Sequence, residues 1–250
     1  RELLFAEGES LDTALVAETV RNLRGLLFLG DIALDTSTSG SDIDIVVRVR
    51  DLYARAVTPL LAGDREELSY GALAMDYNFL GRGQIIQLTL EHDAVTGNRG
   101  EVYYRAPRMG VSRWAVTSLA TVGEEGHLAQ MTFSRPYYAL SAGWTAGGTG
   151  YSQDRVRRRY SNGALSDRYS DRLVGARVWY GRSFGHSTKV RPDIQLSLSD
   201  RRFSPEPGYT YAPKDRRRVL PSVGLLIWRP RYETARFVHQ LGRLEDLQTG

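Results

Sequence analysis

NFLGRGQIIQLTLEHD, residues 78–93, is the stretch that decides the fold class of this 250-residue chain. Its glycine-bearing start, residues 78–83, suggests a phosphate-binding loop, and such a loop must open a helix. The residues that follow do not have helical spacing. Ile86, Leu88 and Leu90 fall on one face of an extended chain, and polar glutamine, threonine and glutamate fall on the other. The stretch is therefore predicted to be a tight turn followed by a strand with one apolar and one polar face.

Segments of the same kind recur along the rest of the chain, about every ten to fifteen residues. Each is bounded by glycine, proline, asparagine or aspartate. We expect ten strands, at 52–61, 67–77, 84–92, 100–107, 113–122, 127–135, 137–147, 172–182, 188–200 and 217–229. No helical pattern separates them, so the expected arrangement is an antiparallel meander.

The two faces of these strands differ in polarity. Apolar residues alternate with polar ones, and charged residues recur where a soluble sandwich would need apolar filling. One apolar face and one charged face is the pattern of a membrane barrel whose outside meets lipid and whose lumen holds water. The residues expected to face lipid are Ile86, Leu88, Leu90, Ile194, Leu196 and Leu198, and those expected to face inward are Thr89, Gln195 and Ser197.

Four charged residues are expected to form a polar network inside the barrel, namely Glu91, Arg105, Arg113 and Arg177. Such a network either braces the wall or contacts a passing chain. The assignment depends on strand register, because a shift of one residue turns every side chain to the other face.

The expected connections come in two sizes. Short ones hold YNFLGRG, APRMGVS and SRPYYA, and longer ones hold HDAVTGNRG, residues 147–171 and residues 200–217. Short and long connections on opposite rims are typical of outer-membrane barrels, which have tight periplasmic turns and long outside loops. On this basis Asn78, Gly81 and Gly83 are predicted to form a periplasmic turn.

A basic run stands in the loop expected at 147–171, with Arg155, Arg157, Arg158 and Arg159. Tyrosines flank it, which makes it the best candidate for nucleic-acid contact. Aspartates surround it, however, and a net charge of +4 does not require nucleic acid, so no such partner is expected. A solvated outside loop, or contact with lipopolysaccharide phosphates, fits better.

The composition excludes several kinds of chemistry. Cysteine is absent, which excludes disulfides, thiolate metal sites and cysteine nucleophiles. The four histidines have no ligand-like spacing, and the chain has no Gly-x-Ser-x-Gly turn. We expect no catalytic, cofactor-binding or metal site, and no enzyme activity. The mean hydropathy of −0.35 does not fit a helical membrane protein, but it fits a barrel, where only alternate residues need be apolar.

The first fifty residues follow a different pattern. Asp12 is a candidate helix cap, and apolar residues from Leu15 to Leu27 recur at helical spacing. Two strands, expected at 28–36 and 42–51, follow the helix and are joined by a polar turn. A helix with a small one-sided sheet predicts a compact α+β unit.

Several of these stretches resemble a known family. FAEGES, VAETVRNLRGLLFLGDIAL and DIDIVVRVRD resemble the end of a polypeptide-transport-associated (POTRA) domain. YGALAMDYNFLGRGQ, YYRAPRMG, TFSRPYYALSAGW and LGRLEDLQTG are similar to the outer-membrane insertase and translocase superfamily, of the barrel-assembly or surface-antigen type. The resemblance implies a mainly β fold. Residues 1–50 would be the C-terminal part of a POTRA-like periplasmic domain, and residues 51–250 the N-terminal part of a sixteen-stranded antiparallel transmembrane β-barrel.

The resemblance also implies a function, the insertion or translocation of polypeptides in the bacterial outer membrane without a cofactor. The implied partners are outer-membrane lipid, lipopolysaccharide and extended polypeptide clients. A strand edge around Phe28, Ile32 and Leu34 would pair with a client by β-augmentation. The chain departs from the family by lacking an Arg-Gly-Phe-type tripeptide, and ten strands do not complete the barrel. We therefore expect a fragment, which also fits a chain that opens on arginine.

Two other functions remain open. The first is a passive channel or structural barrel in which the first fifty residues act as a plug or anchor. The second is a membrane carrier for a catalytic domain encoded upstream.

Overall fold

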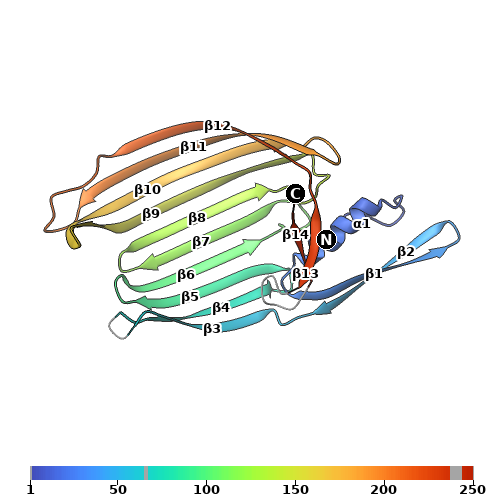
Figure 1. Ribbon diagram of the computed structural model, residues 1–250, viewed down its shortest axis with the longest axis horizontal. Coiled ribbons are helices and arrows are strands. Elements are labelled where there is room, and N and C mark those ends of the chain that lie inside the picture. Colours follow the sequence, from blue (N-terminus) through green and yellow to red (C-terminus); the bar gives the residue numbers. More distant parts are fainter. Residues whose placement is uncertain (1, 65–66, 237–243, 250) are drawn as a thin grey trace.

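Ten strands form one antiparallel sheet in the computed structural model, which describes residues 2–64, 67–236 and 244–249. Strands that follow each other in sequence are neighbours in the sheet, from β3 at one edge to β12 at the other (Figure 1). The strands are β3 Arg55–Ala62, β4 Ser69–Phe79, β5 Gln84–Asp93, β6 Gly97–Ala106, β7 Ala115–Gly123, β8 Gly126–Arg135, β9 Trp144–Ser161, β10 Ala164–Arg182, β11 Lys189–Pro205 and β12 Arg216–Trp228. The antiparallel meander predicted from the sequence is confirmed.

The N-terminal unit contains a helix and a hairpin, α1 Thr13–Arg24, β1 Leu29–Ser39 and β2 Asp42–Asp51. Asp12 caps the helix, because its side chain accepts a hydrogen bond from the backbone N–H of Ala14 at 2.8 Å. Leu23 of the helix packs with Leu29 and Ile32 in a small buried core. Within the described residues, no helix combines the length and the apolar character needed to cross a membrane. The α+β unit expected in the first fifty residues is present.

A second hairpin, β13 Tyr232–Arg236 and β14 Leu244–Gln248, is separate from the ten-stranded sheet. It packs against α1. Arg24 Nη1 lies 2.8 Å from Asp246 Oδ1, and the Arg21 guanidinium lies 4.5 Å from the centre of the Tyr232 ring. The sequence pattern did not predict this pairing between the two ends of the chain.

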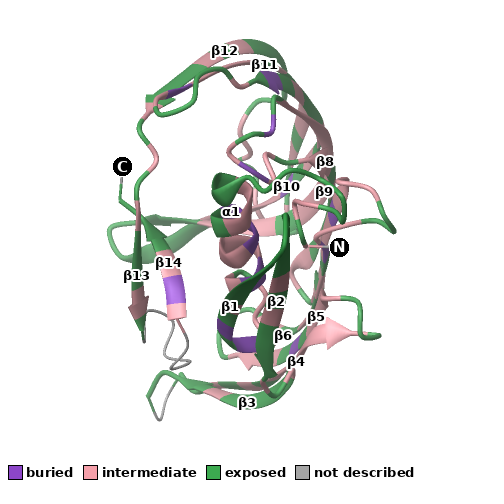
Figure 2. Ribbon diagram, turned by 90° about the vertical axis from the view of Figure 1, so that its right-hand side faces the viewer, coloured by how far each residue is buried: buried purple, intermediate pink, exposed green. Residues whose placement is uncertain are grey.

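The large sheet curls into an open arc, and the N-terminal unit lies across one end of it (Figure 2). The backbone N–H of Leu140 donates to Glu18 of α1, and Asn22 Nδ2 donates to the carbonyl oxygen of Tyr138 at 3.3 Å. Arg191 of β11 also interacts electrostatically with Glu18. The face of β11 that carries Arg191 is therefore the concave, inner face.

Apolar and polar residues alternate between the two faces as predicted. Of the six residues expected to face outward, five are exposed, and Ile86 is half-buried. Among those expected to face inward, Thr89 is only 7% exposed, and Gln195 and Ser197 are half-buried. An exposed apolar side chain beside a covered polar one is the reverse of a soluble core.

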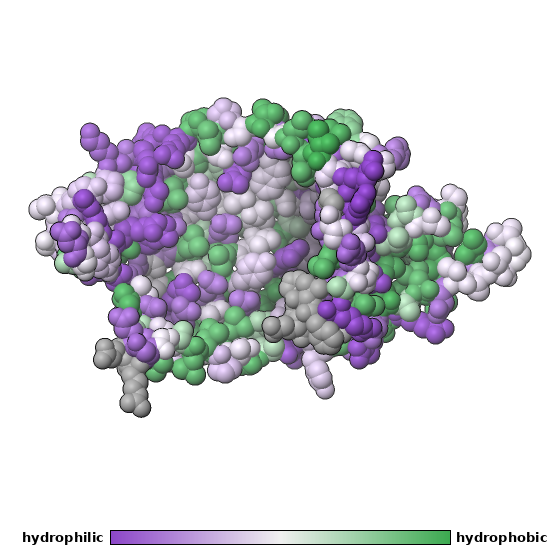
Figure 3. Space-filling model, viewed as in Figure 1, coloured by the Kyte–Doolittle hydropathy of each residue, from purple (hydrophilic) through white to green (hydrophobic). Residues whose placement is uncertain are grey.

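Strand register keeps the apolar residues of the outer face together. Ala74, Leu88 and Val102 are opposite one another on β4, β5 and β6. Figure 3 looks into the hollow of the sheet, which is lined mainly by hydrophilic and neutral residues, whereas apolar side chains gather along its upper margin over β11 and β12. The sheet has a polar concave side and an apolar convex side.

The strand expected at 137–147 and the loop expected at 147–171 are corrected by the structure. Residues 136–143 are a connection, and Trp144–Arg182 is the hairpin of β9 and β10, with its turn at Asn162 and Gly163. Both turn residues have positive φ, 49° and 80°, as a tight two-residue hairpin requires. Ion pairs across the two strands offset part of their charge, as between Arg172 and Asp154.

The expected alternation of short and long connections is wrong. One rim has connections at 80–83, 107–114, 136–143 and 183–188, and the other includes connections at 94–96, 124–125, 162–163 and 206–215. Three connections on the second rim are thus among the shortest. The extra length lies in the strands instead. β9, β10 and β11 have 18, 19 and 17 residues and extend past the shorter β5 to β8 (Figure 1).

Candidate functional site

The edge strand predicted to pair with clients is part of a two-stranded sheet. Among the described residues, β1 pairs with β2 alone, so β1 has one unpaired edge. The side chains of the predicted residues point into the unit rather than outward. Ile32 is 7% exposed, Phe28 packs against the same core, and Leu34 is half-buried. What β1 can offer a partner is therefore its backbone N–H and C=O groups.

The predicted turn at residues 80–83 is present and is closed by Asn78. The Asn78 side-chain oxygen accepts a hydrogen bond from the backbone N–H of Gly83 at 2.8 Å, and its carbonyl oxygen accepts one from Gly81 at 2.7 Å. Both glycines have a φ of 66°, which other residues rarely adopt. No helix follows, so the turn is not a phosphate cradle.

The structure brings this turn and the N-terminal unit together. A cleft of about 760 Å³ lies between them, and Leu26, Phe28, Gly81 and Gly83 are among the residues that line it. A Cβ atom on Gly83 would stand 3.5 Å from the Phe28 ring. Phe28 of the predicted edge and Gly81 and Gly83 of the predicted turn thus line one cleft at the rim of the sheet.

The four charged residues expected to form one inner network do not do so. Glu91 pairs with Arg99 at 2.8 Å, while Arg105 lies opposite Ile85, six residues further along the same strand pair. Six residues of strand span about 20 Å, which no ion pair bridges. Arg113 lies in a connection and stacks on Tyr138 at 4.5 Å, and Arg177 is on β10, four strands from β6. This prediction is wrong because alternation shows which face of the sheet a side chain is on, but not its position along the strand.

An inner charge cluster does exist, around Asp171 of β10. Its side chain is fully buried. Arg201 Nε lies 2.6 Å from Asp171 Oδ1, and Arg157 Nε and Arg155 Nε lie 3.1 Å and 3.8 Å from Oδ2. One carboxylate is thus shared by three guanidinium groups on β9 and β11.

The outer face has a different charge pattern. On β10, apolar residues face outward from Tyr180 to Val174, and Arg172 follows and binds Asp154 of β9 at 2.9 Å. On β12, Arg217 binds Asp200 of β11 at 3.1 Å at the same level. Ion pairs therefore mark one border of the apolar band.

Aromatic residues mark the other border. Trp114 stacks on Phe133 with ring centres 4.6 Å apart, and its ring meets that of Trp144 at 6.3 Å in a T-shaped contact. From Arg172 to Arg182 there are ten residues of strand, about 33 Å long, or about 25 Å in height at the tilt usual for barrels. That is the height of the lipid-facing band of an outer-membrane barrel.

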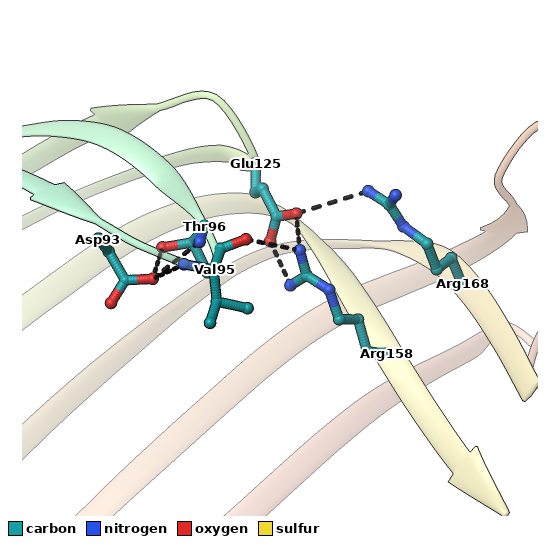
Figure 4. A network of polar contacts seen from close by, with 6 residues as sticks. All are labelled: Asp93, Val95, Thr96, Glu125, Arg158 and Arg168. Atoms are coloured by element: carbon teal, nitrogen blue, oxygen red, sulfur yellow. Dashed lines mark hydrogen bonds and ion pairs between the residues drawn. The ribbon is translucent and has the colours of Figure 1, made fainter. Parts of the chain in front are cut away.

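Polar contacts tie the hairpin tips together beyond the ion-paired border (Figure 4). Arg158 of β9 donates to Glu125 at the β7–β8 tip and to the carbonyl oxygen of Val95 at the β5–β6 tip, the latter at 3.2 Å. Arg168 of β10 lies 3.5 Å from the same Glu125. At the same tip, hydrogen bonds from the Asn98 backbone and side chain hold the pKa of Glu124 below its usual value. The rim is cross-linked through its tips.

The fold resembles a solved structure. It is similar to the crystal structure of BamA from Haemophilus ducreyi lacking POTRA domains 1–3, with a TM-score of 0.45 and 12% identity. The match covers 81% of this chain and 47% of that one, so the chain spans about half the length of that structure. At 12% identity the likeness concerns the fold alone, and no residue role is transferred. No family model and no curated protein matches the chain.

The inner cluster was missed because its residues were assigned to a loop. Two signals could have revealed it. Asn162-Gly163 is the dipeptide most typical of a tight hairpin turn. Before it, Arg155 and Arg157 have the same two-residue spacing that identified the other strands.

Proposed function

We propose that this chain is part of a bacterial outer-membrane protein of the insertase and translocase superfamily. The strands β3 to β12, from Arg55 to Trp228, belong to the barrel wall, and residues 1–50 belong to a POTRA-like unit on the periplasmic side. The observation that carries this proposal is the outward apolar band, bordered by aromatic residues at one end and ion pairs at the other. A band of about 25 Å with such borders fits the hydrocarbon layer of a bilayer.

The proposed role is the insertion or translocation of polypeptides, and it is not enzymatic. The unpaired edge of β1 would accept an extended client strand by main-chain hydrogen bonds, which do not depend on the client's side chains. The cleft between Phe28 and Gly83 adjoins this unit at the rim. A client held there would be close to the inner wall of the barrel.

A pair of proline variants on β1 tests this mechanism. Successive N–H groups of a strand point to opposite edges. Of the two variants Ala33→Pro and Leu34→Pro, one therefore loses an N–H that donates to β2, and the other loses an N–H on the free edge. The variant that loses the N–H on the free edge should keep the hairpin folded and abolish client passage. Ala33→Ser and Leu34→Ile keep both donors and serve as controls. Ile32 is unsuitable, because it is buried in the core of the unit.

The assay is client insertion or secretion in cells that carry the full-length protein, with folding checked by circular dichroism. If both proline variants fold and support normal passage, β-augmentation by β1 is wrong. If neither proline variant folds while both controls do, both N–H groups are needed for the fold of the unit. In that case β1 has no edge free for a client, and the mechanism is also wrong.

Lipid and lipopolysaccharide are further proposed partners. Of the four arginines in the basic run, Arg155, Arg157 and Arg159 belong to the inner face by their register, and only Arg158 faces outward. Arg158 and Arg168 lie beyond the apolar band, at the level of lipid headgroups, where guanidinium groups pair well with phosphates. Weaker binding of lipopolysaccharide by Arg158→Gln in detergent would support this contact.

A passive channel is the second candidate, and one observation favours it. Helix α1 lies across the end of the arc and contacts the 136–143 connection through Glu18 and Asn22. A helix in this position could plug a pore. Ion conductance that rises in Glu18→Ala and Asn22→Ala, in a protein that needs no client, would favour the channel over the insertase.

A further inference from the structure

The inner face of β9 to β12 has a strong excess of positive charge. Strand register places eight positive side chains on this face in addition to Arg159, which pairs with Asp167, and they are Arg155, Arg157, Arg177, Lys189, Arg191, Arg201, Arg216 and Arg218. The same register turns Asp171 and Asp193 inward, and among the described residues only Asp171 lies within 4 Å of any of these groups. Eight positive charges against two negative charges leave a net charge of +6 on this part of the wall.

The rest of the inner wall does not share this excess. By the same register, β5 and β6 turn three carboxylates and two arginines inward, a net charge of −1. Over their paired residues, β3, β4, β7 and β8 turn no charged side chain inward. The positive charge is therefore confined to one strip of four strands and is not a property of the whole lumen.

Four of these seven arginines have no carboxylate partner. Among the described residues, no Asp or Glu oxygen lies within 4 Å of the guanidinium groups of Arg177, Arg191, Arg216 or Arg218. Arg191 stacks on the rings of Tyr137 and Trp228 instead. The remaining three share Asp171, which neutralises one of them. Hollows lined by charges of one sign concentrate ions of the other sign. The strip has the charge and the unpaired donors of an anion-binding surface.

The arrangement is a row rather than a single pocket. Arg177 and the Asp171 cluster lie about 20 Å apart along β10, since six residues of strand separate them. An extended peptide carries every second side chain on the same side, about 7 Å apart. Guanidinium groups pair with carboxylates through two parallel hydrogen bonds. A string of carboxylates on an extended chain matches this surface better than one small anion does.

We propose that the inner wall of β9 to β12 is an anion-binding strip that holds acidic segments of an extended polypeptide client. The proposal deepens the proposed function and rests on it for the nature of the ligand. It adds a substrate class, segments rich in Asp and Glu, and assigns their recognition to Arg177, Arg216 and Arg218. Because β-augmentation reads only the backbone, the strip would add side-chain preference to a transfer that otherwise has none.

The test measures peptide binding to the full-length protein in detergent by fluorescence anisotropy. Three labelled peptides of equal length are compared, alternating serine with glutamate, glutamine or lysine. The glutamate peptide should bind most tightly and weaken as salt is added. Replacing Arg177, Arg216 and Arg218 together by glutamine should weaken its binding about tenfold or more, because several charge-assisted contacts are lost.

A matched control removes the same charge from the opposite face. The triple variant Arg172→Gln, Arg202→Gln and Arg217→Gln changes outward residues and should leave binding of the glutamate peptide unchanged. Equal binding of the three peptides, or an equal loss in both triple variants, would overturn the proposal. If the inner triple variant does not fold, Arg218→Gln is read alone, with the same two outcomes.

The result can be separated from the proposed function. Peptide binding in detergent requires neither client passage nor the β1 edge. Loss of passage in the proline variants with intact peptide selectivity would confirm both proposals. If the folded proline variants support normal client passage, the β1 mechanism is wrong. The anion-binding strip is then judged by the peptide-binding data alone.

Discussion

Leu88 tests whether the outer face of the sheet meets lipid, because a charge there should lower the free energy of unfolding far more than a charge on the inner face. It is exposed on the outer face of β5, beside the half-buried Gln87 on the inner face. Leu88→Arg should lower the free energy of unfolding by roughly 2–4 kcal/mol if the residue lies near the middle of the bilayer. Gln87→Arg is the control and should have a much smaller effect, since its charge enters the wet hollow. Urea unfolding from lipid vesicles gives both values, and equal losses would contradict the lipid-facing assignment.

Asp171 is the residue whose loss should disturb the inner wall most. It is fully buried and shared by three arginines, so Asp171→Asn leaves their charges without a counter-ion. We expect a loss of about 2 kcal/mol in the free energy of unfolding, below the range for fully buried pairs because the arginines are partly exposed. Asp200→Asn, in the outward ion pairs, should lose much less. The same urea titrations compare the two, and a silent Asp171→Asn would mean that the cluster is dispensable.

Single residues were predicted well where alternation alone decided the answer. Leu196 and Ser197 face as expected because a strand has only two faces and one of them is apolar. The ion-pair partners of charged side chains were not predicted, because a contact also depends on which residues of two neighbouring strands lie opposite each other. Glu91 meets Arg99 rather than Arg105 for this reason.

At the level of elements, the hairpin of β9 and β10 is the largest departure from the sequence prediction. Its glycines and arginines suggested a loop. In the structure the glycines lie under aromatic rings, since a Cβ on Gly147 would stand 2.3 Å from Trp179 and one on Gly175 would stand 2.3 Å from the Tyr151 hydroxyl. Arg155, Arg157, Arg159 and Arg172 pair with aspartates on the neighbouring strand of the hairpin. Both features are visible only once the two strands are aligned.

The turn of this hairpin can be tested at Gly163. Its φ is 80°, and a Cβ there would meet nothing within 4 Å, so the strain of a larger residue comes from the backbone alone. Gly163→Ala should cost about 1 kcal/mol of unfolding free energy. Gly150→Ala is the control, because Gly150 lies in β9 at negative φ with equal space around its Cα. No difference between the two variants would argue against the tight turn.

For the whole molecule, the sequence predicted the number and order of the strands in the large sheet, but neither the β13–β14 hairpin nor how the ends of the chain meet. The strand order follows from short connections, which leave few alternatives. The contact of α1 with β14 joins Arg24 to Asp246, 222 residues apart, and the contact with Leu140 joins residues 122 apart. No local pattern encodes such pairs, so the position of the N-terminal unit in the mouth of the arc came from the structure alone.

The central claim, that the convex face of the sheet meets lipid and the concave face meets water, can be measured directly on β11. This chain has no cysteine, so a single cysteine placed at one of positions 194 to 199 is the only site within it that can carry a spin label. In lipid vesicles, labels at Ile194, Leu196 and Leu198 should collide mainly with dissolved oxygen, and labels at Gln195, Ser197 and Ser199 mainly with a water-soluble nickel chelate. Accessibility should therefore alternate with a period of two. If the nickel chelate reaches Ile194, Leu196 and Leu198 as readily as their neighbours, the sheet does not span a membrane, and the account is wrong.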